Sequence, residues 1–188
     1  MEFLNLSSFL EQLRRDGELA VVEAEVDARL EAAEIHRRVI AAGGPALFFT
    51  KVRGKRFPLV TNLFGTSRRA QMAFGQRPMD LVRRIVGLAE EFFPPTLTKL
   101  WGARDIFAAV ARLGLSRRGG GSVLGTNDAP DLRQIPALTC WPEDGGPFIT
   151  LPLVYTEHPD GHGHNLGMYR LHVHGPSETG MHWQIGKG

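Results

Sequence analysis

The sequence predicts an α/β fold whose C-terminal part is built from β-strands. Through residues 1–115, apolar residues at helical spacing alternate with short β-branched runs, a pattern typical of α/β domains. Beyond the glycine-rich segment 116–122 the helical spacing disappears, and prolines separate short apolar runs such as 148–156. We therefore expect an N-terminal α/β domain over residues 1–115 and a β-sheet domain over residues 116–188.

The elements of the first domain follow from apolar spacing and from the residues that end each run. The expected helices cover 5–16, 30–42, 79–92 and 98–113, and the expected strands cover 18–25, 46–52 and 57–64. Gly17 and Gly43 stand where the first two helices end, because glycine accepts the left-handed backbone of a helix C-terminus. The Pro94-Pro95 pair ends the third helix. Segment 116–122, SRRGGGS, is expected to be a flexible connector.

Composition limits the classes of function. The chain has 188 residues, a formal net charge of +2 and one cysteine. So small a charge gives no argument for a nucleic-acid partner, and a single cysteine fits a reducing compartment. No apolar run approaches the ~20 residues of a membrane span, and the N-terminus lacks a signal-peptide pattern. We expect a cytoplasmic protein without a transmembrane segment.

Residues 165–188 carry the densest set of polar and aromatic side chains. Two strand-like runs flank a turn, Gly175-Pro176-Ser177-Glu178, that is rich in chain-reversing residues. In the first run Arg170, His172 and His174 share one parity and therefore one face of the strand. A strand that only supplied a core would not carry these three side chains on one face. The hairpin is therefore predicted to form the wall of a binding site.

Arg170 is the most specific candidate in this hairpin. Its planar guanidinium offers five donors, which suit a phosphate or a carboxylate. On a strand that also carries Met168 and Tyr169 we expect it to be partly buried, so that an anion must meet it. The alternative is an ion pair with a carboxylate of the same fold. Lys187, between two glycines, is a weaker anion-binding candidate.

Histidines cluster in the same region, and a metal site is one explanation. Six of the seven fall between residues 158 and 182: His158, His162, His164, His172, His174 and His182. Their spacing matches no compact zinc motif, so ordinary surface histidines are the alternative for each. His182 differs from the others because it adjoins Trp183 in the second run. Cys140 shows no feature of an activated thiolate.

Two motifs at this spacing point to a family. NLGMYR (165–170), followed by TGMHWQ (179–184) and Lys187-Gly188, closely resembles the flavin-binding hairpin of the UbiD family, which are non-oxidative decarboxylases that use prenylated FMN. Segments 8–13 and 59–65, and LPLVYT (151–156) with its HPDG loop, extend the likeness over essentially the whole chain. The resemblance implies an α/β domain followed by part of a split β-barrel of the flavin reductase type.

The resemblance also implies roles for individual residues. Asn165 would ligate a divalent metal, typically Mn²⁺, through its side-chain oxygen, with His182 as a neighbouring ligand and K⁺ as a further ion. Arg170 would be catalytic, orienting the substrate carboxylate and a proton-donating acid. The residues that would contact the prenylated flavin are Asn165, Met168, Tyr169, Arg170, His182, Trp183, Gln184, Lys187 and Gly188. In a regular strand Asn165 and Arg170 face opposite sides, so we expect Asn165 in the preceding loop or a bulge near Gly167.

The function implied is that of a carboxy-lyase acting on an aromatic or α,β-unsaturated carboxylic acid, as in quinone-precursor biosynthesis. A flavin prenyltransferase would supply the cofactor, and the protein would form a homo-oligomer. In the family the acidic metal ligand and the catalytic acids follow this hairpin, so the 188-residue chain is expected to be inactive by itself. The alternatives are a non-catalytic flavin-binding or oligomer-forming module, and a histidine-rich metal-binding protein without flavin.

Overall fold

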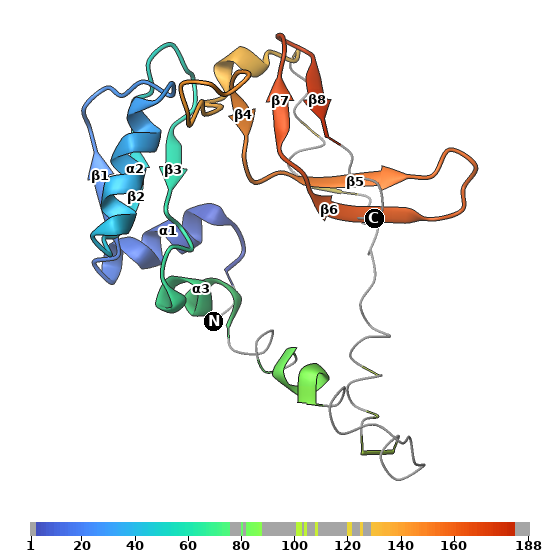
Figure 1. Cartoon of the computed structure of the whole chain (residues 1–188). Coiled ribbons are helices and arrows are strands. Elements are labelled where there is room, and N and C mark those ends of the chain that lie inside the picture. The colour runs from blue at the N-terminus through green and yellow to red at the C-terminus, as the bar shows by residue number, and fades with distance from the viewer. Residues whose placement is uncertain are drawn as a thin grey trace. The chain divides into compact units, whose positions relative to one another are not determined.

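The computed structural model describes residues 3–75, 80, 82–87, 101–102, 104, 108, 120–121, 125 and 129–182 (Figure 1). Contacts group Asn5–Arg69 with Ala129–Gly188 into one compact unit, and Met1–Leu4 with Ala70–Asp128 into another. The mixture of helices and sheets in the chain confirms the predicted α/β class. Of the helix predicted at 79–92, the described residues 80 and 82–87 are helical. The helix predicted at 98–113 and the connector at 116–122 fall largely outside the described residues, so the domain boundary near residue 116 stays a prediction.

The N-terminal part forms a three-stranded sheet with two helices. Its elements are α1 (Leu6–Arg15), β1 (Leu19–Val22), α2 (Glu31–Ala41), β2 (Ala46–Phe49) and β3 (Leu59–Thr61), all within the predicted ranges. β1 runs parallel to β2, and β2 runs antiparallel to β3. α1 begins at a capping box in which Asn5 Oδ1 accepts from the Ser8 amide (2.9 Å), and it ends before Gly17, whose φ is +70°.

The hydrophobic core lies between α2 and this sheet. Phe49 and Ala32 are fully buried there, and Leu138 packs against them from far along the chain. The buried members are Val26, Ala28, Ala32, Leu47, Phe49, Val52 and Leu59. Apolar residues of α2 recur three and four apart, which places Ala32, Ile35 and Val39 on the sheet side.

A third helix, α3 (Ser67–Phe74), is not among the helices that the sequence predicts. Thr66 begins it, because its Oγ1 accepts from the Arg69 amide at 3.2 Å. Arg69 is only 1% exposed and donates to Glu18 at 3.0 Å. The buried position of this helix is therefore occupied by a charged residue. Because the prediction relied on apolar residues at helical spacing, it did not detect the helix.

The C-terminal part contains five strands in two antiparallel sheets. After a 3₁₀ turn, η2 (Leu132–Gln134), come β4 (Phe148–Ile149), β5 (Leu153–Glu157), β6 (His164–Met168), β7 (Leu171–Val173) and β8 (Thr179–Met181). Among the described strands, β5 pairs with β6 alone, whereas β7 lies between β4 and β8. The apolar run 148–156 holds β4 and the start of β5, with Pro152 between them, and η2 is the only helix between residues 130 and 159.

Residues 135–139 connect the sheet of β4, β7 and β8 to the first one within the same compact unit. Thr139 exchanges backbone hydrogen bonds with Ala28 and Leu30, and Leu138 bonds in both directions with Phe148 of β4. This linkage fixes β4, and through it β7, to the N-terminal core. No helix among the described residues has the length and apolarity to cross a membrane.

Candidate functional site

Asn165 and Tyr169 make the most direct contact between predicted site residues. Nδ2 of Asn165 donates a 2.9 Å hydrogen bond to Oη of Tyr169. The tyrosine ring reaches back across Gly167, where a Cβ would stand 2.4 Å from a ring carbon. Glycine is therefore required between them. With Nδ2 engaged, Oδ1 of Asn165 has no donor among the described residues and stays available as an oxygen ligand.

The position of Asn165 corrects the expectation that it lies in the loop before the hairpin. It is a strand residue, paired with Thr156 in the β5–β6 ladder. Gly167 stays in register with Val154, so the described strand carries no bulge there. The β6 ladder ends at Met168 and the chain enters a different sheet at Leu171. The change of direction that sequence parity required is thus made by a strand break after Met168.

Arg170, at that break, stands over a column of rings on β4 and β7. Its Cζ lies 4.5 Å from the ring centroid of Phe148. Phe148 stacks on His172 (4.5 Å between centroids, 24° between planes), and His172 contacts His174 at 4.1 Å. These contacts confirm that the arginine and the two histidines share one face. Phe148, which supports the guanidinium, is not identifiable from the sequence, because β4 is two residues long.

Glycines make room for the two histidine rings. A Cβ at Gly146 would stand 2.4 Å from Nε2 of His172, and one at Gly180 would stand 2.6 Å from Nε2 of His174. Gly180 is the strand partner of His172, so it also fixes the place of this column on β8. The ring column therefore depends on glycines at positions where a larger residue would clash with the histidine rings.

Arg170 itself is exposed, which corrects the expectation of partial burial. The guanidinium lies over the Phe148 ring in a cation–π contact, and the side chain remains exposed to solvent. Among the described residues no carboxylate forms an ion pair with it, so the internal ion pair considered from the sequence is not found there. An exposed, ring-supported cation of this kind can bind a phosphate or a carboxylate bidentately.

Met168 faces away from Asn165. The β5–β6 hairpin exposes an apolar face made of directly paired residues: Leu153 with Met168, and Tyr155 with Leu166. Met168 is 60% exposed on it, whereas Asn165 and Gly167 lie on the opposite, half-buried face. The structure therefore does not bring Met168 and Asn165 to one surface of this hairpin.

The remaining predicted residues lie at or beyond the end of β8. His182 directly follows β8 and is exposed. Trp183, Gln184, Lys187 and Gly188 lie outside the described residues. Elsewhere, burial and then the charge of Asp144 raise the pKa of the Cys140 thiol, which is opposite to what an activated thiolate needs.

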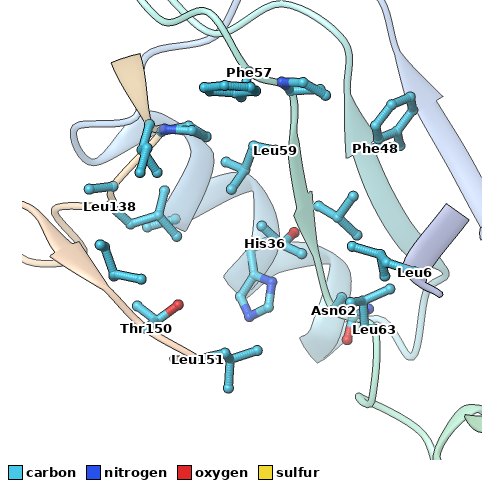
Figure 2. A pocket seen from close by; sticks show the side chains of 18 of the residues that line it. Leu6, His36, Phe48, Phe57, Leu59, Asn62, Leu63, Leu138, Thr150 and Leu151 are labelled. Atoms are coloured by element: carbon cyan, nitrogen blue, oxygen red, sulfur yellow. The ribbon is translucent and has the colours of Figure 1, made fainter. Parts of the chain in front are cut away.

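A separate, largely apolar cavity of about 930 Å³ lies between α2, β3 and residues 135–151 (Figure 2). His36 points into it from α2, and Leu59, Leu138 and Leu151 surround the imidazole. Nδ1 of His36 is buried without a partner among the described residues, and this burial lowers the pKa of the imidazole. None of the site residues predicted from the sequence lines this cavity, although Phe148, which supports Arg170, is part of its wall.

Among the described residues, Asn165 offers an oxygen that can bind a cation, and Arg170 offers a cation that can bind an anion. Asn165 offers a neutral oxygen held in place by Tyr169, and hard divalent ions prefer oxygen ligands. Arg170 offers an exposed planar cation in the segment that immediately follows. One neutral oxygen is far fewer than the six or so ligands such an ion takes, so a metal here needs a phosphate or further side chains as ligands.

Comparison with known proteins gives two successive matches to one family. Residues 10–89 match the 3-octaprenyl-4-hydroxybenzoate carboxy-lyase N-terminal domain, and residues 119–188 match the Rift-related domain of the same carboxy-lyase. A Chlamydia pneumoniae protein described as a subunit of 4-hydroxybenzoate decarboxylase is 45% identical over 176 residues, which cover 93% of this chain and 30% of that protein. The chain spans about a third of the length of the curated relatives it matches.

Solved structures show the same fold. Vanillic acid decarboxylase from Sedimentibacter hydroxybenzoicus, in its closed form, superposes with a TM-score of 0.69 at 23% identity, over 96% of this chain and 37% of that one. An evolved dimeric form of the UbiD-class enzyme HmfF from Pelotomaculum thermopropionicum, in complex with prenylated FMN, gives 0.67 at 23% identity over 96% and 38%. The chain belongs to the UbiD family and corresponds to its N-terminal and Rift-related regions.

Proposed function

We propose that this chain forms part of a carboxy-lyase that releases carbon dioxide from an aromatic or α,β-unsaturated carboxylic acid, using prenylated FMN and a divalent metal such as Mn²⁺, with K⁺ as a further ion. The observation that carries the proposal is the pairing of Asn165 with Tyr169 directly before an exposed, ring-supported Arg170. A ligand oxygen for a metal and a cation for an anion thus lie within six residues of chain.

Each of these residues has a defined task in the proposal. Asn165 binds the cation through Oδ1, while its NH₂ group donates to Tyr169 and so points away from the ion. Arg170 binds and orients the substrate carboxylate, and stacking on Phe148 limits the directions its donors can take. Prenylated FMN, when bound, supplies the electron sink for the breaking carbon–carbon bond. Met168, His182, Trp183, Gln184, Lys187 and Gly188 complete the proposed flavin contacts.

The names of similar proteins favour the aromatic branch of this substrate class. The Chlamydia pneumoniae relative is named for 4-hydroxybenzoate, and a structural neighbour for vanillic acid. Both are aromatic carboxylic acids with a ring oxygen substituent. We propose a substrate of this kind, a role like that of quinone-precursor biosynthesis, a cytoplasmic location, and a flavin prenyltransferase as the source of cofactor. The gap between the two matched regions, 90–118, supports our placing of the domain boundary near residue 116 and of a split β-barrel after it.

The test uses the whole protein, read from the coding sequence that includes residue 188 and whatever follows it. The protein is co-produced with a flavin prenyltransferase, and carbon dioxide release is measured from 4-hydroxybenzoate, vanillate and 3,4-dihydroxybenzoate with and without Mn²⁺. We expect metal-dependent release from at least one acid, and its loss in Asn165→Ala. Flavin-loaded protein that releases nothing from any aromatic or α,β-unsaturated acid would contradict the proposal.

A second candidate is a non-catalytic module that binds flavin or forms oligomers. The exposed apolar face of the β5–β6 hairpin favours it, because apolar sheet faces of soluble proteins are normally covered. Leu153 and Met168, 70% and 60% exposed, form the centre of that face. Sedimentation and decarboxylation assays of Leu153→Glu and of the parent protein separate the two candidates. If Leu153→Glu loses its oligomers but still decarboxylates, the enzyme is favoured. If the parent protein forms oligomers but does not decarboxylate, the module is favoured.

A further inference from the structure

We propose that the loop between β5 and β6 is a second metal site, which takes a borderline transition-metal ion such as Zn²⁺ through His158, Asp160 and His162. The site shares no ligand with Asn165 or His182, and it does not depend on the decarboxylase proposal. The three side chains are the one group of three or more histidine, cysteine or acidic residues close enough to share an ion within the part of the chain that the structure describes.

The distances support one ion. One potential ligand atom from each residue lies within 4.8 Å of those of the other two, and Nδ1 of His158 stands 3.9 Å from Oδ2 of Asp160. Around a tetrahedral zinc with ~2.1 Å bonds, ligand atoms are about 3.4 Å apart. Because all three side chains are exposed, rotation about their own bonds can close the difference without moving a packed core.

The backbone of the loop is already closed, so the ligands are held near one another before any ion binds. The amide of His158 donates to Gly163 O, and the amide of Gly161 donates to His158 O, both at 2.9 Å. Strand pairing of Glu157 with His164 closes the base of the loop. Gly161 and Gly163 take φ values of +74° and +145°, which other residues seldom adopt, and so allow alternate residues to converge. Binding therefore orders side chains only.

The donor set selects the class of metal. Two imidazoles and one carboxylate suit zinc and its transition-metal neighbours, whereas oxygen-only sites suit Mg²⁺, Ca²⁺ and Mn²⁺. Nδ1 of His158 now accepts from the Asp160 amide at 3.1 Å, so an ion on this nitrogen replaces that hydrogen bond. A cavity of about 710 Å³ beside the loop, lined also by Thr156 and Gly163, has room for the waters that complete the coordination.

The site could not be predicted from the sequence, because the spacing of its three ligands matches neither a helical zinc motif nor a zinc knuckle. His158, Asp160 and His162 alternate along the chain, which in a strand would place them on one face. Here the turn at Gly161 brings them together instead. Proximity in this loop depends on two glycines, and only the structure shows it.

The test is calorimetric titration of the tag-free chain with ZnCl₂ in a buffer that does not bind metals, with MnCl₂ in parallel. We expect one Zn²⁺ per chain, with weaker Mn²⁺ binding. His158→Ala/His162→Ala and Asp160→Asn should each lower the Zn²⁺ affinity by at least about tenfold, since even outer-sphere changes cost that much at metal sites. His164→Ala is the matched control, because it removes an exposed imidazole two residues away and should leave the affinity within about twofold.

Circular dichroism of each variant checks that the fold is retained, which the exposure of all four side chains favours. Imidazole resonances of His158 and His162, and not those of His172 or His174, should shift when one equivalent of Zn²⁺ is added. Failure of the parent chain to bind Zn²⁺ would overturn the proposal. Unchanged affinity in the double variant, or an equal loss in His164→Ala, would overturn it as well.

Discussion

The side-chain amide of Asn165 donates a 2.9 Å hydrogen bond to the hydroxyl of Tyr169 across the bare Cα of Gly167. A free asparagine presents either its oxygen or its NH₂ group to a ligand, because the two orientations differ little in energy. In this structure Nδ2 of Asn165 is the donor to Tyr169 Oη, which leaves Oδ1 as the amide atom that can act as a ligand. Three alternate residues of one segment thus act as a single unit.

Tyr169→Phe tests this unit in the whole protein. Loss of the hydroxyl frees the amide while the ring still covers Gly167, so the fold should be retained. We expect Mn²⁺ affinity to fall about 10- to 100-fold, as for other groups that orient metal ligands. Flavin fluorescence titrated with Mn²⁺ measures it, and Tyr155→Phe, on the exposed face of β5, is the control. Equal affinities of Tyr169→Phe and the parent protein would show that Tyr169 does not orient a ligand.

Arg170→Lys should abolish most decarboxylation while leaving the fold intact. Lysine keeps the charge but loses the planar fork of donors. Because the position is exposed, the variant and the parent protein should have nearly the same free energy of unfolding. We expect the rate at saturating cofactor to fall by about 100-fold or more, as misplacement at a reacting centre does. Phe148→Leu should give a smaller loss in the same assay, because it removes the ring below the guanidinium and keeps the guanidinium itself.

If Arg170→Lys turned over substrate as fast as the parent protein, Arg170 would have no role in decarboxylation. Thermal unfolding separates the two variants further. Phe148 contacts both Arg170 and His172, so Phe148→Leu should lower the melting temperature, whereas Arg170→Lys should not.

How much of this structure can be predicted from the sequence depends on whether an element is determined by local signals or by contacts between distant segments. The helices and strands up to residue 61 are predictable, because apolar spacing and glycine stops are local signals. The break after Met168 is not, since polar–apolar alternation continues through Tyr169 and Arg170 while the chain passes between sheets. The sequence placed Arg170 and His172 on one face but could not show Phe148 between them, because that contact depends on the pairing of β4 with β7.

The ion pair of buried Arg69 with half-buried Glu18 should contribute strongly to the stability of the N-terminal part. Arg69 is 1% exposed, its Nη1 lies 3.0 Å from Glu18, and its Nε and Nη2 have no partner among the described residues. Glu18→Gln removes the counter-charge of Arg69 and leaves a buried guanidinium, which typically costs about 3–5 kcal/mol. Urea unfolding of Glu18→Gln measures this.

Glu11→Gln is the control for that experiment. Glu11 pairs with Arg15 at 4.0 Å, and both side chains are 72% exposed. Exposed pairs contribute about 0–1 kcal/mol, so this variant should unfold close to the parent. A Glu18→Gln protein as stable as Glu11→Gln would mean that water reaches Arg69 or that the helix α3 shifts to expose it.

His36 should make the chain less stable at acidic pH. Burial lowers the pKa of its imidazole below the ordinary 6.5, so the unfolded chain binds the proton more readily than the folded one. The stabilising contribution is fully present above pH 6.5 and is lost as the pH falls toward the lowered pKa. The free energy of unfolding should therefore decline from pH 7.5 to pH 5, and less so in His36→Leu, which cannot titrate. Identical pH profiles of the two proteins would exclude His36 as the cause.

The 188-residue chain alone should bind prenylated FMN weakly and release no carbon dioxide. Asn165 contributes one neutral oxygen and His182 at most one nitrogen, whereas hard divalent ions take six or so ligands, usually with carboxylates among them. Arg170 is exposed, so a bound flavin or substrate at this wall stays largely in water, whereas closed pockets bury about 70–90% of a ligand. Among the described residues no carboxylate forms an ion pair with Arg170, so the acid that returns a proton to the product is expected from elsewhere. Titration of the chain with prenylated FMN and Mn²⁺, followed by assay of carbon dioxide release from aromatic acids, measures both quantities. Tight, metal-dependent binding with sustained release would show that these residues already form a complete site.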